Sequence, residues 1–167
     1  MKLKFKHQEF QTDAVNAVAD LFAGQEKTTT TFSVDDNSAQ MRLLHNDFGI
    51  GNKLEIDNDT LLSNMHSIQR RHKLPLSRDY DSRQFSIEME TGTGKTYVYT
   101  KTILELNKRY GFSKFIIVVP SVAIREGVFK SLQVTEEHFK NLYDGIPYRY
   151  FIYNSAKLSD VRQFATS

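Results

Sequence analysis

A glycine-rich loop constrains this chain of 167 residues more than any other feature. The pattern Gly92-x-Gly94-Lys95-Thr96 follows a short β-prone run, 85–89, and precedes apolar residues at helical spacing. A phosphate chain needs several backbone N–H groups aimed at one point, and glycine permits that close approach. The helix that follows directs the positive end of its dipole at the anion. The loop therefore predicts a binding site for the phosphates of a nucleotide.

The side chains of the loop suit the same chemistry. Lys95 can reach the β- and γ-phosphates as a mobile point charge, and the Thr96 hydroxyl can coordinate Mg²⁺. We expect ATP and Mg²⁺ as cofactors, Lys95 and Thr96 as catalytic residues, and a cofactor-binding set from the loop: Thr91, Gly92, Thr93, Gly94, Lys95 and Thr96. The structural alternative is a Gly-Thr-rich turn that only caps a helix.

Two departures narrow the class of nucleotide-binding protein. The strict pattern places glycine where this chain has Met89, which points away from kinases and small GTPases and toward motor ATPases. Hydrolysis also needs an acidic residue beyond a neighbouring strand to hold Mg²⁺ and orient water, and the chain contains no Asp-Glu pair. We expect that the chain stops before this acidic motif, and that these 167 residues alone hydrolyse ATP negligibly.

The order of predicted elements indicates an α/β protein with a mostly parallel sheet flanked by helices. Continuous apolar runs such as Lys114–Val119 are typical of strands buried on both faces. Helices are predicted near residues 8–23, 60–71, 121–132 and 135–143, the first ending at Gly24. A further helix is predicted after the glycine loop and before Gly111, because apolar residues recur there at helical spacing: Tyr99, Ile103, Leu106 and Tyr110. Strands are predicted at 85–89, 114–119 and 148–153.

Composition excludes several other classes. The net charge of +2 argues against a polybasic chain, and 40% apolar residues support a packed core. The absence of cysteine excludes disulfides and thiolate chemistry, and the five histidines form no H-E-x-x-H pair. No apolar run approaches the ~20 residues needed to span a bilayer, and the N-terminus has no secretory signal. We expect a soluble cytoplasmic protein with no membrane partner.

Two strings in the sequence resemble known helicase motifs. Residues 87–97, IEMETGTGKTY, are similar to motif I of superfamily 2 helicases, and 114–127, KFIIVVPSVAIREG, to their motif Ia region. More narrowly, both resemble the restriction (Res) subunit of type III restriction–modification systems. The segment Phe10-Gln11-x-x-Ala14-Val15 is similar to that family's adenine-recognition segment. The resemblance therefore adds Gln11 to the cofactor-binding residues.

The resemblance implies a longer subunit, an ATP-dependent type III site-specific deoxyribonuclease. It would combine two RecA-like motor domains with a nuclease, act on double-stranded DNA and work with a modification (methyltransferase) subunit. Residues 1–167 would then be an incomplete first RecA-like domain with a P-loop. Within it we expect an adenine-recognition helix region at 1–24, an insertion at 24–84 and the P-loop α/β core at 85–167.

Several readings of these residues stay open. Ser121 and Arg125 follow an apolar run and would face nucleic acid, although an N-cap serine and a solvated arginine would look the same. The basic run 70–73 is expected to be a solvated helix end, with DNA contact as the less favoured reading. Other functions remain: another superfamily 2 helicase acting on DNA or RNA, a small-molecule kinase, or a non-catalytic nucleotide-binding module.

Overall fold

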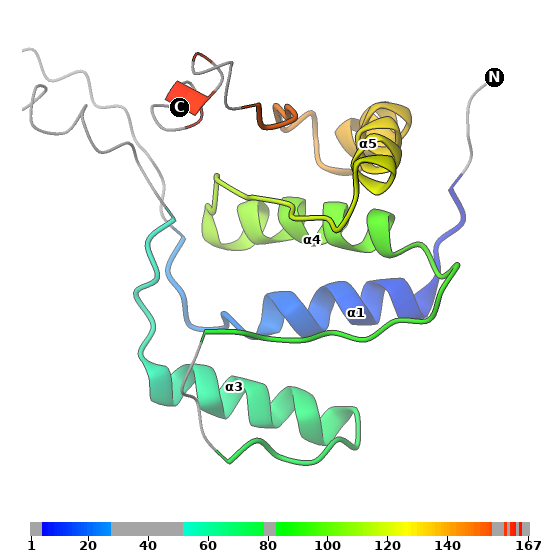
Figure 1. Ribbon diagram of the computed structural model, residues 1–167. Coiled ribbons are helices and arrows are strands. Elements are labelled where there is room, and N and C mark those ends of the chain that lie inside the picture. Colours follow the sequence, from blue (N-terminus) through cyan, green and yellow to red (C-terminus); the bar gives the residue numbers. More distant parts are fainter. Residues whose placement is uncertain are drawn as a thin grey trace, which may run out of the picture.

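The structure, a computed structural model, describes residues 5–27, 52–78 and 83–154, together with residues 159, 161, 162 and 164. Four helices lie within these ranges: α1 (Glu9–Asp20), α3 (Asn58–Arg71), α4 (Lys95–Tyr110) and α5 (Val122–Leu142). Figure 1 shows them as a row in which α3 packs on α1, α1 on α4, and α4 on α5. Much of the predicted 24–84 insertion, including 28–51 and 79–82, lies outside the described residues.

The contact between α1 and α4 forms one part of the hydrophobic core. Four buried side chains meet there, with Phe22, Leu54 and Phe115 packed around them: Ala19, Leu106, Tyr110 and Phe112. The Tyr110 hydroxyl donates a 2.9 Å hydrogen bond to the Ala19 carbonyl, so the polar tip of this buried ring is satisfied. The two helices run in the same direction, because their first turns meet near Gln11 and their last turns meet at Asp20.

The opposite side of α4 packs on α5. Leu104, Phe139 and Tyr143 form a second buried cluster there. The sequence pattern predicted one apolar stripe on this helix, through Tyr99, Ile103, Leu106 and Tyr110, but α4 buries residues on two faces because it lies between two other helices. Small polar residues complete these faces: Thr100 and Thr102 are buried, and each donates its hydroxyl to the carbonyl four residues earlier.

Polar contacts tie α3 to the end of α1. Asn64 donates from its amide to the carbonyls of Leu21 and Ala23, at 3.0 and 2.8 Å. Asp20 accepts from Arg71 of α3 and from Arg109 of α4, both at 3.0 Å, so one carboxylate joins three helices. These bonds close the turn that ends α1 against α3.

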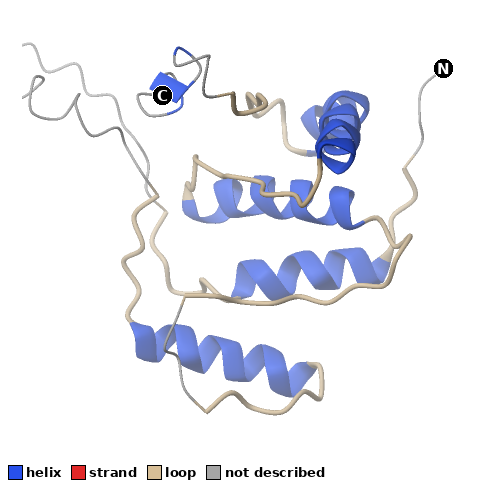
Figure 2. Cartoon of the chain, viewed as in Figure 1, coloured by secondary structure: helices blue, strands red, loops and turns tan. Residues whose placement is uncertain are grey.

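The prediction of a mostly parallel sheet flanked by helices is wrong for the described residues. Figure 2 shows helices and loops but no strand in this part of the chain. Residues 84–90, 111–119 and 146–154 form neither helix nor strand. A strand needs a neighbour to complete its ladder of hydrogen bonds, and no backbone hydrogen bond joins these segments within the described ranges. The apolar run expected to be buried is instead open to solvent, with Ile116 78% and Val118 87% exposed.

The helix predictions were closer. The helices expected at 8–23 and 60–71 appear as α1 and α3, and Gly111 ends α4 with a left-handed φ of 75°. The stop predicted at Gly24 is wrong, because α1 ends at Asp20 and residues 21–24 form a turn. The break expected between 132 and 135 is absent, because α5 runs unbroken through it. No glycine or proline interrupts residues 128–142, and Leu132, Thr135 and Phe139 share the face that packs inward.

Candidate functional site

The glycine loop joins the segment 84–90 to the first turn of α4. Gly92 and Gly94 have φ of 83° and 84°, a left-handed conformation that L side chains rarely adopt. Gly94 is also the N-cap of α4 and has no side chain to cap it. No backbone N–H of residues 91–96 donates to another described group outside α4, so this turn exposes a set of unused donors. The loop is solvent-accessible, with Thr91 and Gly92 exposed.

The Lys95 ammonium lies back over this loop. It donates to the carbonyl oxygens of Met89 and Glu90, at 3.1 and 2.9 Å. The Thr93 hydroxyl donates to the same Glu90 carbonyl at 2.6 Å. The Glu90 carbonyl therefore accepts from both Thr93 and Lys95, and an exposed positive charge lies against the loop. The sequence pattern placed Lys95 here but did not identify the two carbonyls, because any residue can supply a main-chain acceptor.

Gln11 lies against the same loop, although it is 82 residues away from Thr93 in the sequence. Its Nε2 donates to the Thr93 carbonyl at 2.9 Å. A Cβ atom on Gly94 would lie 2.7 Å from that Nε2, so glycine is needed for the contact as well as for the turn. The structure thus brings together Gln11, Thr93, Gly94 and Lys95, four of the seven predicted cofactor-binding residues, around one turn.

The helix α1 holds Gln11 in place through contacts along its length. Lys101 donates to the Thr12 hydroxyl at 3.3 Å, one residue beyond Gln11. At the other end, Arg109 donates to Asn16 and Asp20, at 2.9 and 3.0 Å. Burial has the largest single effect on the pKa of Arg109 and lowers it. The hydrogen bonds and charges of Glu105 and Asp20 together outweigh burial, so the pKa of Arg109 is raised.

An aromatic cluster that the sequence did not indicate lies just after the loop. Tyr97, in the first turn of α4, shares a 3.0 Å hydrogen bond with His138 Nε2 of α5. The Phe5 ring stacks on Tyr97 and packs on His138, with centroid distances of 5.7 and 4.4 Å. Burial, and secondly the charge of Lys101, lower the pKa of His138. This histidine joins α5 and the N-terminal segment to the loop-bearing helix.

Ser121 and Arg125 lie at the start of α5. The Ser121 hydroxyl accepts from the Ile124 N–H at 3.3 Å and is the N-cap of this helix. Arg125 donates to the neighbouring Glu126 carboxylate at 2.9 Å. Both residues therefore have local structural partners, and their contact with nucleic acid stays a prediction.

The residues at the loop suit a nucleotide phosphate better than they define a metal site. Glycines with positive φ, unused N–H donors and one ammonium form a cationic turn that could accept an anion. Thr96 follows Lys95 in the first turn of α4 and could offer one hydroxyl ligand to Mg²⁺. Across the described residues, no group of three His, Asp or Glu side chains is close enough to hold a metal ion.

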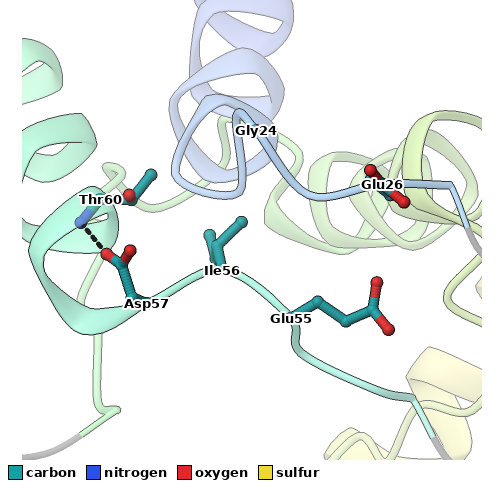
Figure 3. Close-up of a pocket in the computed structure, with 6 residues that line it drawn as sticks. All are labelled: Gly24, Glu26, Glu55, Ile56, Asp57 and Thr60. Atoms are coloured by element: carbon teal, nitrogen blue, oxygen red, sulfur yellow. Dashed lines mark hydrogen bonds between the residues drawn. The ribbon is translucent and has the colours of Figure 1, made fainter.

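A hollow of about 460 Å³ lies at the other end of α1. Figure 3 shows its lining, which comes from the turn at Gly24 and the segment before α3. Two of its three carboxylates have local roles: Asp57 caps α3 by accepting from the Thr60 N–H at 2.6 Å, and Glu55 pairs with Lys53 at 2.7 Å. We assign no function to this hollow, which is remote from the glycine loop.

The chain belongs to a family of restriction enzymes. The family model described as "Type III restriction enzyme, res subunit" matches residues 4–148, a range that includes α1, the glycine loop and α5. The resemblance inferred from the motifs at 87–97 and 114–127 is therefore confirmed.

Curated relatives agree with this assignment. The chain is 35% identical over 144 residues to the type III restriction-modification enzyme EcoPI Res subunit of Escherichia phage P1, covering 83% of this chain and 14% of the relative. It is 35% identical over 143 residues to the EcoP15I Res subunit of Escherichia coli, with the same coverage. It is 46% identical over 66 residues to the StyLTI Res subunit of Salmonella typhimurium, covering 38% of this chain and 7% of the relative.

The chain thus spans about 14% of the length of the first two relatives. None of the helices in the described residues is both long enough and apolar enough to cross a membrane.

Proposed function

We propose that this chain is the ATP-binding part of the DNA-translocating motor of a type III restriction endonuclease. In the whole subunit, ATP hydrolysis would drive movement or switching on double-stranded DNA, and cleavage would follow. The modification (methyltransferase) subunit would select the site, and the assembly would work in the cytoplasm. Membership of the Res family supports this class of motor.

One observation carries the nucleotide part of the proposal: Gln11 and the glycine loop meet at Thr93. The amide of a glutamine has two N–H donors and one carbonyl acceptor. One N–H is used on Thr93, which leaves the other N–H and the carbonyl to read the edge of an adenine base. Phosphates on the N–H groups of Thr91–Thr96 and a base near Gln11 would then belong to one ATP molecule.

We further propose roles for the remaining parts of the site. The Lys95 ammonium would turn from the carbonyls to the β- and γ-phosphates, and the Thr96 hydroxyl would be one ligand of Mg²⁺. Mg²⁺ would neutralise the charge that develops on the transferred phosphoryl group. Ser121 and Arg125 would contact DNA phosphates rather than bases. In this arrangement residues 1–24 recognise adenine, 24–84 form an insertion, and 85–167 hold the phosphates within an incomplete motor domain.

The decisive experiment is Lys95→Ala in a full-length Res subunit that contains this sequence. We expect DNA-stimulated ATP hydrolysis to fall by at least ~10²-fold, because a cation aimed at the transferred phosphate is removed. The far-ultraviolet circular dichroism should be unchanged, since Lys95 is exposed. Lys130→Ala, which removes an exposed lysine from α5, is the matched control and should retain full activity. Undiminished hydrolysis in the Lys95 variant would refute the nucleotide site.

A further inference from the structure

The turn that follows α3 is held in place by several hydrogen bonds. Gln69 donates to the Ser77 hydroxyl at 2.8 Å and accepts from the Ser77 N–H at 3.1 Å. His66 shares a 2.8 Å hydrogen bond with the Ser77 carbonyl. The Leu74 N–H donates to the Gln69 carbonyl, and Lys73 has a left-handed φ of 56°. We call residues 70–78 the basic turn; its path is fixed by side chains of α3.

The basic turn presents three unneutralised cations to solvent. Arg70, Lys73 and Arg78 are exposed, and none of them forms an ion pair within the described ranges. Arg71, between them in the sequence, is different because it binds Asp20 of α1. By contrast, several other surface cations form ion pairs with nearby glutamates, including Lys53, Arg125 and Lys140. A turn that is held by hydrogen bonds to α3, and whose three cations have no acidic partner in the described part of the chain, is therefore suited to an anionic partner.

The apolar part of the turn helps to identify that partner. Leu74 and Leu76 are 56% and 43% exposed and flank Pro75. Protein interfaces depend on aromatic anchors and are depleted in lysine, whereas residues 70–78 contain no Phe, Tyr or Trp. Arg and Lys side chains are the usual ligands of nucleic-acid phosphates. The composition thus favours a phosphate backbone over a protein surface.

We propose that the basic turn binds the phosphate backbone of duplex DNA through Arg70, Lys73 and Arg78, without reading sequence. The choice of duplex DNA as the partner rests on the proposed function. The charge and geometry of the turn are observed independently of that function. The turn also lies close to the motor site, because the His72 imidazole is 3.6 Å from the Asp13 carboxylate, two residues after Gln11. Figure 1 shows the end of α3 on the same side of the helix row as the glycine loop. Arg70 and Lys73 are exposed, as expected for a solvated helix end, and the proposal adds the DNA contact that the sequence left as the less favoured reading.

The test is the salt dependence of DNA affinity in the full-length Res subunit. Each phosphate contact contributes about 0.9 to the slope of log affinity against log salt for duplex DNA. We expect Arg70→Gln/Lys73→Gln/Arg78→Gln to reduce the slope by about 2.7 and to weaken binding at least ~10-fold at ~0.1 M salt, equally for unrelated sequences. A control that removes three exposed lysines elsewhere, Lys27→Gln/Lys53→Gln/Lys140→Gln, should leave the slope unchanged.

Two further variants keep the result interpretable. Lys73→Asn changes one exposed residue and should lower the slope by about 0.9 even if the triple variant folds poorly. Arg70→Lys/Arg78→Lys retains both charges and should keep the parental slope. An unchanged slope in the Lys73 and triple variants would overturn the proposal, as would loss of assembly with the modification subunit while DNA affinity is retained. ATP hydrolysis without DNA should be normal in all of them, so a failure here differs from failure of the Lys95 assignment.

Discussion

Gln11 on α1 donates a 2.9 Å hydrogen bond to the carbonyl of Thr93 in the loop that opens α4. The contact joins two segments that are 82 residues apart in the sequence, and it fixes the distance between the first helix and the proposed phosphate site. It also makes the conformation of the loop depend on the identity of residue 11.

We predict that Gln11→Ala weakens ATP binding about tenfold, which corresponds to roughly 1.4 kcal/mol for a lost hydrogen-bonding group. GTP binding should weaken less, because its base presents different edges to the amide. Isothermal titration of both nucleotides with the full-length subunit measures this. If the two affinities fell by the same factor, Gln11 would hold the loop without reading the base.

Replacement of Gly94 should be more harmful than replacement of Gly92. Both have a left-handed φ, so Ala at either position costs about 1–2 kcal/mol of strain. Only at Gly94 would the new Cβ lie 2.7 Å from Gln11 Nε2, whereas nothing lies within 4 Å at Gly92. We therefore expect Gly94→Ala to unfold at lower urea than Gly92→Ala.

The double variant Gly94→Ala/Gln11→Ala tests whether the extra cost at Gly94 passes through Gln11. The amide ends a flexible side chain and can move away from a new Cβ, but it then loses its hydrogen bond to Thr93. The double variant should therefore be no less stable than Gly94→Ala. Equal urea midpoints for Gly92→Ala and Gly94→Ala would contradict the close contact between Gln11 and the loop.

The partial burial of His138 between α4, α5 and the N-terminal segment should make stability depend on pH. Burial, then the charge of Lys101, lower the pKa of His138 from its usual 6.5. A base with a lowered pKa in the folded state binds protons more readily when unfolded, so stability is full above about pH 6.5 and falls as the pH drops below it. His138→Phe should reduce this loss, as shown by urea midpoints at about pH 7.5 and about pH 5.5 relative to the parent. The same pH dependence in both proteins would assign the effect to other groups.

The helices were predictable because their signals are local. The apolar spacing in α1, α3 and α4, and the glycine after α4, depend on residues within a few positions of one another. The strands were not, because Phe115–Val119 reports only an extended, apolar preference, and a sheet needs partners that the run itself does not specify. The structure leaves this run unpaired within the described residues.

The candidate site divides in the same way. The pattern of Gly92, Gly94 and Lys95 predicted the loop, since the conformation is encoded in the glycines themselves. The contact of Lys95 with Met89 and Glu90 was not predictable, because main-chain carbonyls have no signature in the sequence. The packing of Phe5 on His138 depends on how α5 crosses α4, which no local pattern encodes.

In the proposed nucleotide site, the position of the Lys95 ammonium has a consequence for how the ligand would enter. An ammonium has three N–H bonds, and two already serve the carbonyls of Met89 and Glu90. A phosphate that accepts more than one of them must displace a carbonyl, so arrival of the ligand loosens the stretch that leads into the loop. Ligand binding at the loop would then change the conformation of segment 84–90, which precedes the loop, as well as affecting α4.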